Sequence, residues 1–266
     1  MYVMTGDLHT DRQRAESFGA SAERYDRSRP SYPPALVDHL LGPTPSGLEV
    51  LDVGCGTGIA ARLMADRGAS VLGVEADPRM AEVAGRRGTP VEVARFEEWD
   101  SRGRVFDLVT AAQVWHWVDP RAGAARAASL LRPGGRLCLF WNIGSPPAEV
   151  RAAFEQVYRE VAPEADGFSV ATTYSVDRGY EAERAGIRAT AGLSGPLEHR
   201  FEWSRTYTRD EWLDQLPTHS DHIAMSPDRL QRVLDGIGAV IDRFGGGFEM
   251  AYSTLLLESV RERTAP

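Results

Sequence analysis

The sequence predicts an α/β protein with a doubly wound, mostly parallel sheet, an antiparallel last strand and a helical cap. Three observations predict this class. Between residues 46 and 144, short apolar strand patterns alternate with helical patterns, which is typical of parallel strands covered by helices on both faces. A glycine-rich loop, residues 54–58, follows the first of these strands. Two later segments, 197–207 and 248–257, have strand patterns that we expect to pair antiparallel.

The elements follow one another in a regular order. Helical patterns cover residues 10–30, where Pro30 ends the helix, and residues 34–42. The five strand patterns that follow cover residues 48–53, 70–76, 90–95, 105–112 and 136–142, and the helical patterns between them cover 57–68, 77–88 and 119–135. Asp77 and Pro78 fit the N-cap and the first position of a helix, because aspartate accepts hydrogen bonds from free amides and proline needs no donor there.

After Asn142 the pattern changes. Residues 145–163, 175–186 and 226–247 are predicted helices, and residues 197–207 alternate at period two with Leu197, Phe201, Trp203 and Tyr207 on one side. We expect one domain over residues 1–266, made of an N-terminal helical cap (1–45), a ligand-binding core (46–144), an insertion or lid (145–195), and a C-terminal strand pair with helices (196–266).

The composition excludes several classes of protein. The chain has 266 residues, 42% of them hydrophobic and 26% charged, with a net charge of −8, so we expect no nucleic acid as partner. It contains no lysine, which excludes a lysine Schiff base and a P-loop lysine. Its two cysteines make no disulfide framework, and no segment is apolar enough for a signal peptide or a membrane span. We therefore expect a cytoplasmic protein without a membrane partner.

The glycine-rich loop predicts a ligand with a ribose. Gly54, Gly56 and Gly58 stand at the carboxyl end of a predicted parallel strand, where a backbone can approach a bound molecule closely. Glu75 ends the next strand, 17 residues after Gly58, and an acid there can accept both hydroxyls of a ribose. The loop can be read as the G-x-G-x-x-A form of a dinucleotide site, but D-x-G-x-G-x-G, beginning at Asp52, is the better match.

At this point the resemblance becomes specific. VLDVGCGTG resembles motif I of class I S-adenosylmethionine (SAM)-dependent methyltransferases, and VEAD, ARFEEWD, FDLVTAAQVWHW and LLRPGG resemble later motifs of that family in the right order. The resemblance covers about residues 18–142. With FGASAERYDRSRPSYP and QVWHWVD, the chain looks closest to the small-molecule group that includes trans-aconitate methyltransferase-like enzymes. It implies a Rossmann-like class I fold, SAM as cofactor and S-adenosylhomocysteine as product.

The resemblance also implies a set of cofactor-binding residues. These are Tyr25, Arg29, Asp52, Gly54, Gly56, Gly58, Glu75, Ala76, Met80, Phe96, Glu97, Ala111 and Gln113. By resemblance, Glu75 would bind the ribose hydroxyls, and Tyr25 and Arg29 would reach the methionine carboxylate from the N-terminal helix. Ala76 and Met80 would flank the adenine.

The methyl acceptor is expected to be a small molecule, methylated at the oxygen of a carboxylate or a hydroxyl. The candidate substrate-binding residues are Trp115, His116, Trp141, Asn142 and His219, and the candidate catalytic bases are His116 and His219. Methylation at nitrogen or carbon, a non-catalytic SAM-binding regulator and a nicotinamide-dependent oxidoreductase remain alternatives. With no H-E-x-x-H helix and no paired CxxC we expect no metal site. We expect a monomer or a homodimer.

Overall fold

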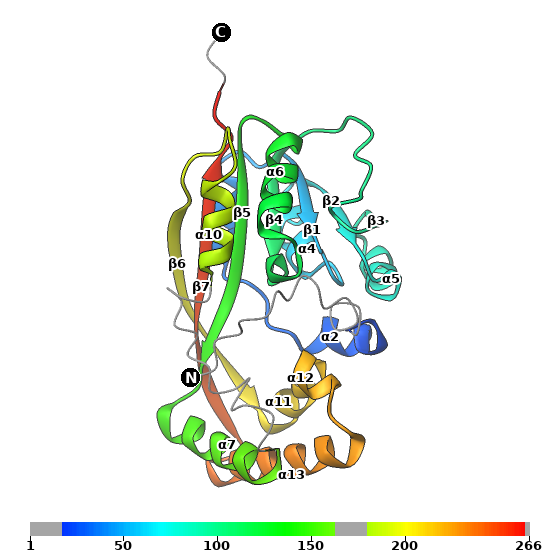
Figure 1. The fold of residues 1–266 in the computed structure, drawn as a ribbon. Helices are drawn as coiled ribbons and strands as arrows, with labels where there is room; N and C mark the ends of the chain where they lie inside the picture. Colours follow the sequence, from blue (N-terminus) through cyan, green and yellow to red (C-terminus); the bar gives the residue numbers. More distant parts are fainter. Residues whose placement is uncertain (1–17, 163–179, 264–266) are drawn as a thin grey trace.

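The computed structural model describes residues 18–162 and 180–263, whose strands form one sheet in the order β3-β2-β1-β4-β5-β7-β6 (Figure 1). The strands are β1 Glu49–Val53, β2 Ser70–Glu75, β3 Val91–Val93, β4 Phe106–Ala112, β5 Leu131–Ser145, β6 Leu197–Thr208 and β7 Gly247–Val260. β1 to β5 run parallel, whereas β7 pairs antiparallel with both β5 and β6. The predicted doubly wound sheet with an antiparallel end is confirmed.

Helices cover both faces of the parallel strands. One face carries α3 (Pro34–Leu41) and α4 (Ile59–Ala65). The other carries α6 (Pro120–Leu130) and α10 (Glu181–Arg188), which lie in front of the strands in Figure 1. Successive strand residues point to opposite faces, so Val50 and Leu108 are buried with the first pair of helices. Their neighbours Leu51 and Val109 are buried with the second pair. The strands are apolar on both faces for this reason.

Aspartate side chains cap the first turns of α5 (Pro78–Arg86) and α6. Asp77 caps α5 by accepting a hydrogen bond from the amide of Arg79, as predicted. The predicted end of α6 is wrong, because this helix ends at Leu130 and not at residue 135. Leu131 already pairs with Phe106 of β4, so pairing with the sheet ends the helix.

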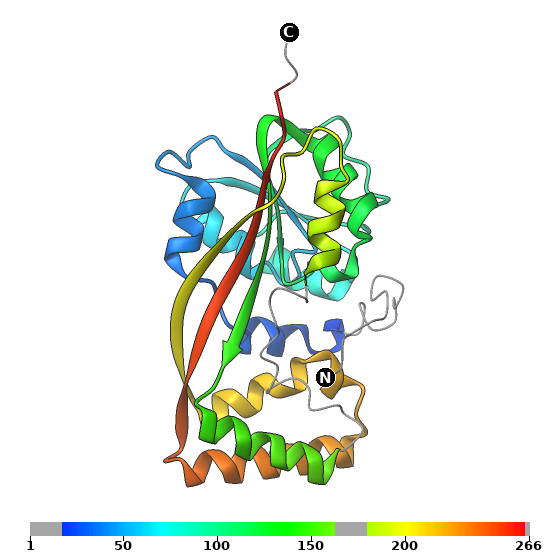
Figure 2. The ribbon, with the colours of Figure 1, turned by 60° about the vertical axis from the view of Figure 1, so that its left-hand side comes forward.

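Strands β5, β6 and β7 extend beyond the parallel strands as a long ribbon that carries a helical cap (Figure 2). The cap comprises α7 (Ala148–Val161), α11 (Arg209–Gln215), η4 (Leu216–Thr218), α12 (Ser220–Ile223) and α13 (Pro227–Arg243). Its core joins Phe154 of α7 to Ile237 of α13 and to Tyr207 and Phe248 of the ribbon. Residues 163–179 of the predicted insertion and residues 10–17 of the first predicted helix lie outside the described residues, so the lid stays a prediction.

The period-two pattern of β6 is only partly as expected. Phe201 and Trp203 are partly shielded and Tyr207 is buried, whereas the residues that point the other way, Glu202, Ser204 and Thr206, are exposed. Leu197, predicted on the same side, is 61% exposed because it is the first residue of an edge strand.

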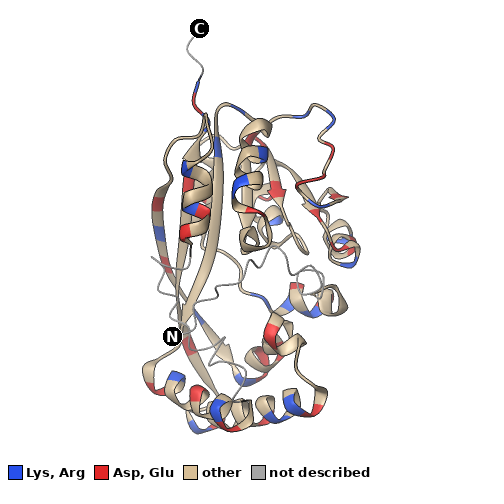
Figure 3. Ribbon diagram, viewed as in Figure 1, with Lys and Arg blue, Asp and Glu red and all other residues tan. Residues whose placement is uncertain are grey.

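Figure 3 shows charges of both signs mixed along the helices. Among the described helices, none combines the length and the apolar character needed to cross a membrane.

Replacing Phe154 by alanine should destabilise the cap strongly. The Phe154 side chain is fully buried, and its ring lies 6.5 Å from that of Trp212 and 5.6 Å from that of Phe248. Phe154→Ala should lower the free energy of unfolding by about 3–5 kcal/mol, measured by urea denaturation. Phe244→Ala is the matched control, because Phe244 is 39% exposed and should lose less than about 1 kcal/mol. Equal losses in the two variants would contradict the packing described for the cap.

Candidate active site

A cleft lies at the carboxyl ends of β1 and β4, between the parallel strands and the segment that follows α2 (Ala22–Ser28). Its empty volume, including its open mouth, is about 480 Å³. The residues that line it are Tyr25, Arg29, Pro30, Tyr32, Gly54, Cys55, Gly56, Thr57, Ile59, Ala60, Ala112, Gln113 and Asn142. The cleft therefore brings together residues that are far apart in the sequence, from the N-terminal helix to the end of β5.

The glycine loop is shaped so that only glycine fits well. Gly54, Gly56 and Gly58 have φ angles of +59°, +58° and +85°, which residues with a Cβ rarely adopt. At Gly54 a Cβ would also stand 2.3 Å from a methyl carbon of Val114. The loop thus presents bare backbone to the cleft.

Glu75 holds this loop in place through hydrogen bonds to backbone amides. Its carboxylate accepts hydrogen bonds from the amide of Gly56 at 2.8 Å and from the amide of Asp77 at 2.9 Å. Burial raises the pKa of Glu75, although these amides act in the opposite direction. Glu75 therefore fixes the loop, and its binding to a ribose stays a prediction.

Asp52 lies beneath the loop and is completely buried. Its Oδ1 accepts a hydrogen bond from the Thr110 hydroxyl at 2.9 Å, and its Oδ2 has no partner among the described residues. Burial raises the pKa of Asp52 to about 7, against the opposing effect of Thr110. Asp52 does not line the cleft, and its hydrogen bond to Thr110 joins β1 to β4, so its place in the cofactor site stays a prediction.

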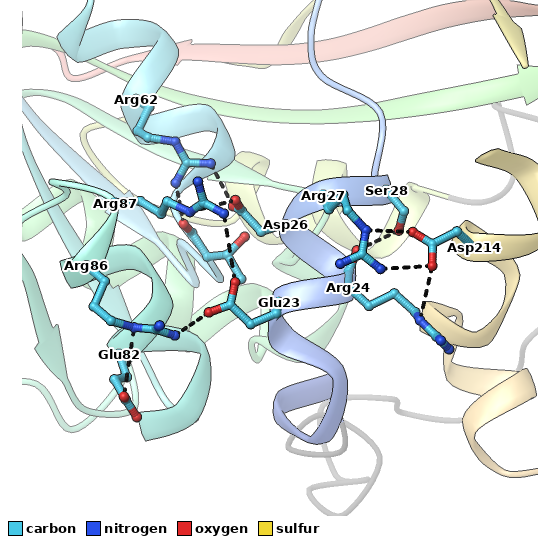
Figure 4. A network of polar contacts seen from close by, with 11 residues as sticks. Glu23, Arg24, Asp26, Arg27, Ser28, Arg62, Glu82, Arg86, Arg87 and Asp214 are labelled. Atoms are coloured by element: carbon cyan, nitrogen blue, oxygen red, sulfur yellow. Dashed lines mark hydrogen bonds and ion pairs between the residues drawn. The ribbon is translucent and has the colours of Figure 1, made fainter. Parts of the chain in front are cut away.

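Helix α2 is held over the cleft by ion pairs on two sides (Figure 4). Toward the core, Asp26 pairs with Arg62 at 2.6 Å and with Arg87 at 3.4 Å. Toward the cap, Arg27 pairs with Asp214 of α11 at 2.9 Å. The helix that carries Tyr25 into the cleft is therefore anchored to both parts of the molecule.

Arg29 connects the cleft to the cap. Its guanidinium lies 4.8 Å from the centre of the Tyr25 ring and donates a 2.7 Å hydrogen bond to the carbonyl of Thr218. The next residue, His219, has its pKa held well below the ordinary value, first by burial and then by the positive charge of Arg29 and the neighbouring His222. The imidazole of His219 is therefore neutral at physiological pH.

Gln113 and Asn142 form the opposite wall. Gln113 has a φ angle of +60°, a strained conformation for a residue with a side chain, and its amide donates a 3.1 Å hydrogen bond to the carbonyl of Asn142. The Asn142 side chain donates to the carbonyl of Ser31 and accepts from the Thr254 hydroxyl, at 2.9 and 2.6 Å. These bonds fix both side chains at the edge of the cleft.

Several predicted residues lie elsewhere. Trp115, Trp141 and Ala111 are buried within the core, with at most 1% exposed, and Met80 and Phe96 are 4% exposed. Further predicted residues outside the lining of the cleft are Gly58, Glu75, Ala76, Glu97, His116 and His219. Met80 packs beside the loop, since a Cβ on Gly56 would stand 3.5 Å from its methyl group. These binding assignments stay predictions.

Sequence reasoning missed other lining residues. They are Pro30, Tyr32, Cys55, Thr57, Ile59, Ala60 and Ala112. Tyr32 belongs to the same RSRPSYP segment as Arg29, and Thr57 belongs to the glycine loop, so extending each motif by a few residues would have found both. Cys55 and Cys138 are free thiols, as expected.

The cleft fits a cofactor with polar groups. The buried Thr57 hydroxyl and Arg29 Nε have no hydrogen-bond partner among the described residues, although both residues line the cleft. The glycine loop leaves the space that a Cβ would take at Gly56. A buried polar atom without a partner is unfavourable, so these atoms are suited to bind a ligand.

Comparisons with known proteins show the family of the chain. A family model described as a methyltransferase domain matches residues 25–242. An uncharacterized methyltransferase of Mycobacterium tuberculosis is 42% identical over 134 residues, which make up 49% of this chain and 54% of that protein. A ubiquinone biosynthesis O-methyltransferase of Xanthomonas axonopodis is 38% identical over 103 residues, or 36% of this chain and 43% of that protein. The chain thus spans about half the length of the curated relatives it matches.

A solved structure extends the comparison to the fold. The structure of a type II methyltransferase from Anaeromyxobacter dehalogenans has a TM-score of 0.66 and 21% sequence identity. The match covers 89% of this chain and 99% of that chain.

The buried Asp52 should make stability depend on pH. The pKa of about 7 in the folded protein is above the value of about 3.9 expected in the unfolded chain. Between these values the folded protein keeps a proton that the unfolded chain has lost, so stability decreases as the pH rises from 4 to 7. Asp52→Asn removes the carboxyl that titrates. The free energy of unfolding of the variant, minus that of the wild type, should therefore increase by roughly 3–4 kcal/mol between pH 4 and pH 7.

Urea denaturation at several pH values between 4 and 8 measures this difference. Asp66→Asn is the matched control, because Asp66 is exposed and its replacement should shift the curve without changing its shape. If the curves of Asp52→Asn and the wild type stay parallel, the buried carboxyl does not titrate as described.

Proposed function

The chain belongs to the family of class I SAM-dependent methyltransferases, and we propose that it transfers the methyl group of SAM to an oxygen atom of a small molecule. The observation that carries the proposal is the cleft, in which the glycine loop faces Tyr25 and Arg29 of the N-terminal segment. The two motifs are separate segments of the sequence. Their meeting in one cleft supports a site for a ligand with a backbone-binding part and an anionic part.

The residues of the cleft suit the parts of SAM. Backbone at Gly54 and Gly56 leaves room for close approach, and Glu75 would bind the ribose hydroxyls. Arg29 would bind the methionine carboxylate, since a guanidinium is the natural partner of a carboxylate. When bound, SAM supplies a methyl group already activated by a positive sulfur.

The remaining task of the protein is to position the acceptor and to exclude water. Gln113 and Asn142 are held rigidly at one wall, and α2 covers the cleft through its ion pairs. Alignment of two reacting groups can contribute roughly 7–11 kcal/mol to lowering the barrier. A rigid cleft would therefore account for much of the proposed rate enhancement.

Oxygen is the proposed acceptor atom. The relative from Xanthomonas axonopodis is a ubiquinone biosynthesis O-methyltransferase, which supports an oxygen acceptor for this chain. A carboxylate is already ionised at neutral pH, but a hydroxyl acceptor needs a base. His219 is the better candidate, because Arg29 ties its loop to the cleft and its neutral imidazole can accept a proton.

The position of α2 should control the affinity for SAM. Asp26 pairs with two arginines and its side chain is only 7% exposed, so Asp26→Asn leaves positive charges without a partner and loosens the helix. We expect it to weaken SAM binding about tenfold, measured by isothermal titration calorimetry. Glu23→Gln is the control, because Glu23 is 51% exposed and should change the affinity less than about twofold. If wild type binds NAD⁺ and not SAM, the family assignment of the cleft is wrong.

His219→Asn tests the proposed base. With a hydroxyl acceptor found by screening phenols and alcohols with radiolabelled SAM, kcat should fall about 10²- to 10⁴-fold while SAM affinity stays unchanged. His116→Asn is the matched variant and should keep most of the activity. Equal losses of kcat in the two variants would contradict the role of His219 as the base. Methyl transfer to amines alone would contradict the proposed oxygen acceptor.

A further inference from the structure

Three metal-ligating side chains meet on the face of the sheet covered by α3. His39 comes from α3, His199 from β6 and Glu258 from β7. His39 Nε2 lies 2.6 Å from Glu258 Oε2, and His199 Nε2 lies 3.8 Å from the same oxygen. The three donor atoms all lie within 4.8 Å of one another.

The sheet itself places two of these residues side by side. Leu197 pairs with Glu258 and His199 with Leu256, so His199 and Glu258 are diagonal neighbours on one face. The last turn of α3 brings His39 over them, and the two imidazole rings lie 4.5 Å apart. The cluster is therefore set by three elements packed together, and not by a flexible loop.

The chemistry of the cluster suits a divalent transition-metal ion. Two histidines and one carboxylate form a common ligand set for zinc, with a solvent molecule in the fourth position. Around a tetrahedral zinc ion with bonds of about 2.0–2.1 Å, donor atoms stand about 3.3 Å apart. The distances at the cluster lie on both sides of this value, so small side-chain movements would suffice.

We propose that His39, His199 and Glu258 form a binding site for a divalent transition-metal ion such as Zn²⁺, separate from the cleft. The side chains of His39 and His199 are 32% and 35% exposed, so an ion can reach them from solvent. The Glu258 side chain is only 11% exposed, so its contact with an ion would be shielded from water on most sides.

Arg136 is compatible with this site. Its guanidinium lies 3.4 Å from Glu258 Oε1, the other oxygen of the carboxylate, and also donates to the carbonyls of His39 and Leu40. Arg136 therefore engages one oxygen of Glu258 and leaves Oε2, the oxygen that lies nearest to both histidines, for an ion.

The bound ion would clamp α3 to the long ribbon. Glu258 pairs with Cys138, and Asn142 of the cleft lies four residues further along β5, or about 13 Å away at the usual rise of a strand. At that distance the ion would act on the stability of the fold. Its binding does not depend on the proposed methyl transfer.

Zinc binding to the full chain tests the proposal. Calorimetry with Zn²⁺ should show one ion per chain, and at 100 times the dissociation constant the melting temperature should rise by about 5–10 °C, reversed by a chelator. His39→Asn and His199→Asn should each weaken binding more than tenfold. Both side chains are partly exposed, and the melting temperature without zinc shows whether the variants fold.

Two control variants locate the ion. Glu202→Gln changes an exposed carboxylate on the same strand as His199, and His219→Asn changes a histidine of the cap. Both should keep the zinc affinity of the wild type. Absence of zinc binding, or the same affinity in His39→Asn and His199→Asn as in the wild type, would overturn the proposal. Cobalt absorption that changes in those two variants and not in the controls would support it independently.

Discussion

The pairing of β5, β7 and β6 is the interaction on which the rest of the structure depends. β7 pairs with β5 from Ala251 to Val260 and with β6 from Gly247 to Glu258. One end of this ribbon completes the parallel sheet, and the other end forms part of the core of the cap. The distance between core and cap is therefore determined by backbone hydrogen bonds, which are stiffer than a contact between side chains.

The cleft uses this rigid frame on one side and α2 on the other. Asn142 stands on the ribbon, where Thr254 of β7 holds its side chain. Arg29 follows α2 and binds a carbonyl of the cap. A site assembled in this way depends on the core, the cap and the N-terminal segment together, so specificity for the acceptor can change through the cap while the glycine loop stays the same.

The parts of the structure that the sequence predicted correctly are those determined by residues close together in the chain. The alternation of strands and helices, the cap at Asp77 and the glycine loop each depend on neighbouring residues, and the structure agrees with them. The end of α6 was misplaced, because the pairing of Leu131 with a distant strand overrides the helical pattern. The places of Trp115 and Trp141 in the core depend on how helices pack over the sheet. The meeting of His39 with Glu258 joins opposite ends of the chain, and no short motif indicates it.

The strand order has a consequence for how the protein is made. β6 is synthesised before β7, yet its pairing partner in the sheet is β7, which lies between it and β5. During synthesis β6 therefore waits as an unpaired strand while α11, α12 and α13 are added. An unpaired strand can associate with other chains, so the interval before residues 247–260 emerge is the time of greatest risk of aggregation. Completion of the last strand closes that interval and, through Thr254, fixes the Asn142 side chain at the edge of the cleft in the same step.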